Sequence, residues 1–143
     1  MQDALFKNLL HKAAGYQIIS HGQEIDKGYK PDVVLKSEDD YIIMECDTGT
    51  TRKAYIGGMV KAAKYLSGNR KGIAVFVIEE KDNTTVTQIH SHLIPYFEWI
   101  KPLTNLKAVY LISVKAYCPV DKPLEIFTAD FLNQAKAILR VTI

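Results

Sequence analysis

Residues 31–51 read PDVVLKSEDDYIIMECDTGTT, and this stretch decides the fold of the chain. Two β-rich runs flank the acidic tetrapeptide at 37–40, a pattern that predicts two antiparallel strands joined by a tight turn. The TGTT at 48–51 predicts the start of a helix, because Thr and Gly are common at helix N-termini. A β-hairpin followed by a helix is therefore the centre of the predicted architecture.

The turn determines which residues of the hairpin face each other. If Lys36 pairs with Tyr41, Asp32 lies directly across from Glu45. Opposed side chains of an antiparallel pair have Cβ atoms about 4.5–5.5 Å apart and like charges there are destabilising, so a positive group is expected between them. Because side chains alternate along a strand, Asp47 shares the face of Glu45. Three carboxylates are thus predicted to converge where the second strand ends.

The alternative for these carboxylates is that water simply solvates them at the strand ends. A slip of one residue in the hairpin would also send Asp32 to the opposite face. Two observations favour convergence. Glu45 follows the apolar run YIIM, where an unpaired charge is costly, and Asp32 is the lone charge before VVL.

Oxygen ligands that converge without His or Cys suit Mg²⁺ or Mn²⁺ rather than zinc. An ion held in this way can lower the pKa of a bound water and neutralise charge that grows on a phosphodiester. A nearby ammonium stabilises the same charge. Lys61 is the preferred cation, because Gly57, Lys61 and Tyr65 form one stripe of the helix predicted at 52–66.

The rest of the chain alternates between apolar patterns of helical and strand period. The predicted elements are a helix over 3–14, strands at 16–20, 32–36 and 41–47, a helix over 52–66, a central strand at 71–80, a helix from 83 to 100 that Pro95 kinks, strands at 106–117 and 123–128, and a closing helix over 129–140. This order predicts an α/β domain with a mixed sheet flanked by helices.

Composition is typical of one globular domain over residues 1–143, with 48% hydrophobic and 24% charged residues. A net charge of +2 neither indicates nor excludes a polyanionic partner. Cys46 and Cys118 stand far apart and outside any zinc-binding spacing, so no disulfide framework is expected. No apolar run reaches the ~18 residues of a membrane span or resembles a signal peptide, which predicts no membrane partner and a cytoplasmic location.

The sequence over residues 31–47 resembles the motifs of the PD-(D/E)XK nuclease superfamily, which includes restriction endonucleases and junction resolvases. Pro31-Asp32 looks like its PD, residues 45–47 look like its (D/E)XK, and the predicted order over residues 1–80 is similar to its αβββαβ core. Asp47 occupies the position that is usually lysine. Some branches carry an acidic residue there or recruit a lysine from the next helix, and Lys61 stands where many members have the Gln of a Q-x-x-x-Y pattern.

The string PD, ECDTGT and KAAKY also looks like the replication-relaxation proteins of plasmids and mobile elements. That family usually has a winged-helix DNA-binding segment upstream, and no such segment is expected within residues 1–143. The resemblance implies a role in DNA processing, in restriction or in mobile-element maintenance. Duplex cleavage by analogy needs two sites, which implies a homodimer or a partner subunit for DNA recognition.

The sequence therefore predicts a restriction-endonuclease-like domain that hydrolyses DNA with Mg²⁺ or Mn²⁺. Asp32 and Glu45 are predicted to bind the metal ion, Asp47 to assist as a third ligand or as a base, and Lys61 to stabilise developing charge. The predicted DNA contacts are Arg52, Lys53 and Lys64.

Two other functions remain open. A catalytically silent relative would bind DNA or a plasmid-replication partner without cutting. The string at 45–50 also resembles the D-x-D-x-T loop of haloacid-dehalogenase-type phosphatases, although Glu45 replaces their nucleophile and the preceding hairpin has no role in that fold.

Overall fold

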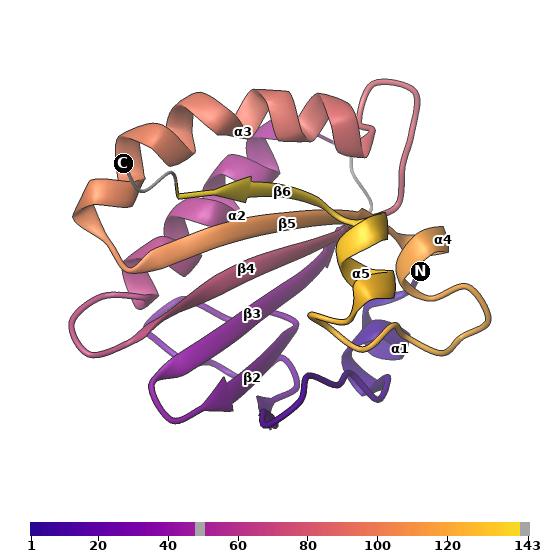
Figure 1. The fold of residues 1–143 in the computed structure, drawn as a ribbon, viewed down its shortest axis with the longest axis horizontal. Coiled ribbons are helices and arrows are strands. Elements are labelled where there is room, and N and C mark those ends of the chain that lie inside the picture. Colours follow the sequence, from indigo (N-terminus) through magenta and orange to yellow (C-terminus); the bar gives the residue numbers. More distant parts are fainter. Residues whose placement is uncertain (48–50, 141–143) are drawn as a thin grey trace.

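The computed structural model describes residues 1–47 and 51–140, and within them one six-stranded mixed sheet forms the centre of the molecule (Figure 1). The strands lie side by side in the order in which they occur in the chain. Their bounds are β1 Gln17–Ser20, β2 Val33–Ser37, β3 Asp40–Asp47, β4 Lys71–Ile78, β5 Leu106–Ser113 and β6 Lys136–Leu139. The predicted fold class, α/β with a mixed sheet, is confirmed.

The β2–β3 hairpin has the predicted register. Lys36 pairs with Tyr41 and Val33 with Met44, and the turn between the strands places Glu38 at a positive φ of 54°. β1 is antiparallel to β2, whereas β3, β4 and β5 run parallel to one another and β6 is antiparallel to β5. β4 is central and residues 72–78 are buried, as its continuous apolar run predicts.

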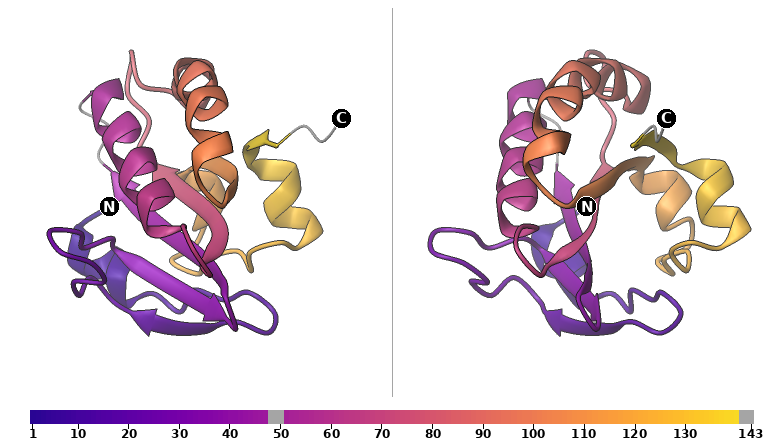
Figure 2. Two further views of the ribbon diagram at one scale, coloured as in Figure 1. Left: turned by 90° about the vertical axis from the view of Figure 1, so that its left-hand side faces the viewer. Right: turned by 60° about the vertical axis from the view of Figure 1, so that its left-hand side comes forward.

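Helices cover both faces of this sheet (Figure 2). Two long helices join the parallel strands, and both connections advance in the same direction along the sheet, so a common handedness places them on one face. These are α2 (Arg52–Tyr65) and α3 (Val86–Ile100), which the short 3₁₀ turn η1 (Lys101–Leu103) follows. The other face packs against α1 (Asp3–Asn8), α4 (Val114–Tyr117) and α5 (Ala129–Gln134).

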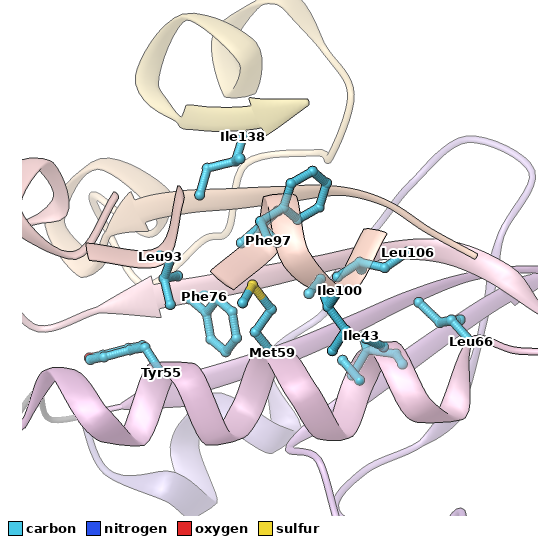
Figure 3. Close-up of a cluster of buried hydrophobic side chains, with 14 of the residues drawn as sticks. Ile43, Tyr55, Met59, Leu66, Phe76, Leu93, Phe97, Ile100, Leu106 and Ile138 are labelled. Atoms are coloured by element: carbon cyan, nitrogen blue, oxygen red, sulfur yellow. The ribbon is translucent and has the colours of Figure 1, made fainter. Parts of the chain in front are cut away.

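The larger of two hydrophobic clusters fills the space between the sheet and α2 and α3 (Figure 3). Met59 of α2 lies against Phe76 of β4, while Leu93 and Phe97 of α3 close the cluster, and all four are buried. Ile43 belongs to this cluster, whereas its neighbours on β3 pack into the cluster on the other face. Glu45, two residues after Ile43, therefore shares the face that α2 covers.

The first helix is shorter than predicted. α1 ends at Asn8, and Leu9 is already extended, so the prediction of a helix through residue 14 is wrong. The cause is His11, which is buried and binds Tyr117 Oη through Nδ1 and the Phe6 carbonyl through Nε2, at 2.6 and 2.7 Å. These tertiary hydrogen bonds stabilise an extended segment that the local pattern cannot reveal.

The C-terminal third contains three further corrections. β5 ends at Ser113 and residues 114–117 form α4, and residues 123–128 are not a strand and contribute only one bridge, between Ile126 and Ala13. The closing helix predicted over 129–140 divides into α5 and the edge strand β6. Phe131 packs on one face of the sheet and Ile138 on the other, which a single helix could not achieve, because residues seven apart share a helix face.

Candidate functional site

The candidate site lies at the end of the β2–β3 hairpin, on the face covered by α2. Asp32 precedes β2, and its Oδ2 accepts a hydrogen bond of 2.8 Å from the Cys46 backbone N–H. The other carboxylate oxygen, Oδ1, is 4.0 Å from Lys7 Nζ. Burial raises the pKa of the Asp32 carboxyl and outweighs the hydrogen bond and the lysine, which lower it. Asp32 is thus tied to β3 at the position predicted for it.

Glu45 is the most perturbed acid of this site. Its Oε2 lies where a side chain at position 58 would begin: a Cβ on Gly58 would approach it to 2.8 Å. Burial is the main cause that raises the pKa of Glu45 to about 7, the charges of Asp32 and Asp47 raise it further, and Lys61 opposes the shift. A carboxyl with this pKa is close to half-protonated at neutral pH, and a cation beside it would favour its charged form.

Asp47 and Lys61 complete the group of predicted residues. Asp47 is the last residue of β3 and is partly buried; its carbonyl accepts a hydrogen bond from Glu79 N, and its negative charge reaches Glu45. Lys61 is exposed on α2, and its positive charge acts on the same carboxyl. The structure therefore brings Asp32, Asp47 and Lys61 within electrostatic range of Glu45.

The cysteine between the acids belongs to a different environment. Cys46 packs into the hydrophobic cluster on the opposite face, and burial raises the pKa of its thiol to about 12. The sulfur is therefore a neutral core group, and the chemistry of the site rests on oxygen and nitrogen groups alone.

The donor set fits a hard divalent cation in its chemistry. Carboxylate oxygens are the ligands that Mg²⁺ prefers. The negative charges of Asp32 and Asp47 repel that of Glu45, so a bound cation would stabilise the charged form of Glu45 most. Among residues 1–47 and 51–140, however, no three Asp, Glu, His or Cys side chains are grouped closely enough to form a preassembled metal centre. Both oxygens of Asp32 already have partners.

The predicted DNA contacts have different surroundings. Arg52 Nε donates to the Asn83 carbonyl at 3.1 Å, which ties the start of α2 to the loop before α3. Lys53 and Lys64 are exposed on α2. Lys64 borders a small pocket together with Lys61. The TGT at 48–50, which belongs to the predicted helix start, lies outside the described residues.

Sequence reasoning misses three residues that shape the site. Lys7 comes from α1 to within 4.0 Å of Asp32, and Gly58 leaves room for Glu45. Tyr29 is buried in the loop before β2, and no hydrogen-bond partner contacts its hydroxyl in the described part of the chain. Burial, and then the charges of Glu45 and Asp32, raises the pKa of Tyr29. Only Gly58 leaves a signal, since adjacent glycines inside a helical pattern are costly unless space requires them.

Comparison with known proteins finds no matching family model, no matching curated protein and no matching solved structure. Across the described residues, no helix has the length and apolar character needed to cross a membrane.

Proposed function

We propose that this chain is a divalent-metal-dependent DNA endonuclease with a restriction-endonuclease-like core, of the PD-(D/E)XK type. The observation that carries the proposal is the environment of Glu45, a half-buried carboxyl with a pKa of about 7 on which the charges of Asp32, Asp47 and Lys61 all act. The element order α1, β1, β2, β3, α2, β4 supports it, because this is the αβββαβ order of that core.

Asp32, Glu45 and Asp47 would hold Mg²⁺ or Mn²⁺. When bound, such an ion supplies neutralisation of the charge that grows on a phosphodiester during hydrolysis. Lys61 stabilises the same charge from α2, and Asp47 at the strand end accepts a proton from the attacking water. Lys7 holds Asp32 in place, and Gly58 keeps α2 close to Glu45 without displacing its carboxylate.

Cleavage of supercoiled plasmid and of branched DNA in Mg²⁺ or Mn²⁺ tests this function. Glu45→Gln and Lys61→Gln should each lower the cleavage rate by roughly 100- to 1,000-fold, the scale on which one preorganised electrostatic group acts. Lys122→Gln, an exposed lysine on the other side of the sheet, is the matched control and should cleave normally. Metal-dependent cleavage that is equal in Glu45→Gln and the original chain would rule out this site.

A second candidate is a nuclease-fold protein that binds DNA without cutting it. The ties of both Asp32 oxygens, to Cys46 N and Lys7 Nζ, favour this alternative, because they leave Asp32 less free to bind a metal. It predicts DNA binding that persists in EDTA, weakens steeply with salt and is unaffected by Glu45→Gln.

A further inference from the structure

A small pocket lies beside the candidate site, between the loop before β2 and the outer face of α2. Its volume is about 160 Å³, and it is lined by Asp26, Lys27, Gly28, Tyr29, Lys61 and Lys64. This is several times the roughly 30 Å³ that one water occupies. It is well below the roughly 300–1,000 Å³ of a site for a drug-sized ligand. Its size suits one small polar group with its waters rather than a whole nucleotide.

The charge of the pocket is positive. Lys61 and Lys64 lie one helical turn apart on α2 and Lys27 comes from the loop, and within residues 1–47 and 51–140 none of the three forms an ion pair. Asp26 is the one acid in the lining, and its Oδ1 accepts a hydrogen bond of 2.9 Å from the Lys27 backbone N–H. Like charges one turn apart on a helix are destabilising, so an anion beside Lys61 and Lys64 would relieve their repulsion.

Two residues connect this pocket to the carboxylates. Lys61 lines the pocket and also acts on the charge of Glu45. Tyr29 lines it as well, and its buried hydroxyl, which has no hydrogen-bond partner in the described part of the chain, lies within the electrostatic range of Glu45 and Asp32. The loop that carries Tyr29 is held in place by two backbone hydrogen bonds, from Ile25 N to the Tyr29 carbonyl and from Tyr29 N to the Asp26 carbonyl.

We infer that this pocket binds one phosphate of a DNA strand, a phosphate next to the one at the carboxylates. The inference rests on the proposed function for the identity of the polymer, whereas the positive pocket itself does not depend on cleavage. Lys27 and Lys64 contact the phosphate, Lys61 is shared with the carboxylates, and the loop at 25–29 becomes part of the DNA-binding surface.

Binding in EDTA tests this inference separately from cleavage. The probe is a fluorescein-labelled 20-base-pair DNA duplex, and its anisotropy is followed at several salt concentrations for the full chain. The double variant Lys27→Gln/Lys64→Gln should weaken binding roughly tenfold and reduce the steepness of the salt dependence by about one contact. The matched control, Lys122→Gln/Lys136→Gln, removes the same charge from exposed residues elsewhere and should stay within twofold of the original chain.

Three outcomes would overturn the inference. The first is that the original chain does not bind DNA at 50 mM salt, and the second is that DNA affinity falls equally in the pocket variant and the control. The third is that micromolar inorganic phosphate displaces the DNA, which would make free phosphate the ligand. The two proposals fail differently. A chain that binds DNA through Lys27 and Lys64 but never cuts it loses the nuclease function and keeps the pocket. A chain that cuts DNA, but whose DNA binding is unchanged in Lys27→Gln/Lys64→Gln, keeps the nuclease function and loses the proposed phosphate pocket.

Discussion

Among the acids of the candidate site, Glu45 has the pKa that its surroundings raise most. Glu45 is placed among apolar neighbours by the strict alternation of β3, and it lies under α2 with two further acids in range. Burial away from water disfavours the charged form of Glu45, and the negative charges of Asp32 and Asp47 disfavour it further. Acids with a pKa perturbed by burial and by a neighbouring charge cluster at functional sites, which agrees with the role proposed for Glu45.

The stability of the chain should therefore fall as the pH rises through the range in which Glu45 ionises. Below pH 4.5 both states carry the proton; between 4.5 and about 7 the unfolded chain loses it first, so folding becomes less favourable. One pKa unit corresponds to about 1.4 kcal/mol, so the loss reaches up to about 3 kcal/mol by pH 8 without divalent ions. Glu45→Gln should remove this loss, as measured by denaturant unfolding in EDTA at pH 4.5 and 8.

The control for this experiment is Glu125→Gln, an exposed residue that precedes α5 on the other side of the sheet. Its free energy of unfolding should follow that of the original chain at both pH values. Parallel pH profiles for Glu45→Gln and the original chain would contradict the account of a strained carboxyl.

The sequence predicts the site where local rules determine it. Alternation along β3 and the register of a two-strand hairpin depend on neighbours in the chain, so the face of Glu45 and the position of Asp32 can be predicted. Lys7 and Tyr29 reach the same site from outside the hairpin and its helix. Their places depend on how α1 and the loop before β2 pack, which no periodicity records.

At the scale of one element, α2 contains a pair of glycines whose neighbours differ. A Cβ on Gly57 would meet open space, whereas a Cβ on Gly58 would lie 2.8 Å from Glu45 Oε2 and 3.0 Å from Phe76 Cε1. Alanine is favoured over glycine inside a helix by about 0.8–1 kcal/mol. Gly57→Ala should therefore stabilise the chain by about that amount.

Gly58→Ala gains the same helical preference but must displace a carboxylate and an aromatic ring. Overpacking of this kind costs about 1–3 kcal/mol, so the variant should be less stable than Gly57→Ala by roughly that margin. It should also impair cleavage, because Glu45 moves. Thermal unfolding of the two variants in parallel measures the difference, and equal stabilisation by both would show that α2 does not pack against Glu45.

Helices and strands were predictable where packing and local pattern agree. β4 has a continuous apolar run and is central, and α2 has one apolar stripe and lies on the sheet. Residues 129–140 have a helical pattern, yet the open edge of β5 gains four paired residues when 136–139 become a strand. That advantage arises from β5, whose paired residues lie between Leu111↔Lys136 and Ala108↔Leu139 in the register, and tertiary context overrides helix propensity.

At the scale of the whole molecule, the sheet separates two environments. The face under α2 carries the acids, Lys61 and the positive pocket, whereas the opposite face buries Cys46, Tyr117 and Phe131 in a hydrophobic cluster. Parallel strands β3, β4 and β5 and the two helices that join them form the framework of the first face. The proposed chemistry lies on the α2 face, and α1 on the other face contributes Lys7, which lies 4.0 Å from Asp32.

The most direct test of this account is a calorimetric titration of the chain with Mn²⁺ at pH 7.5, without DNA. We expect one ion per chain, with release of protons because Glu45 is partly protonated before the ion binds, and loss of both signals in Glu45→Gln. Lys122→Gln should titrate as the original chain does. Absence of binding, or binding of equal strength in Glu45→Gln, would contradict the claim that these carboxylates form a cation site.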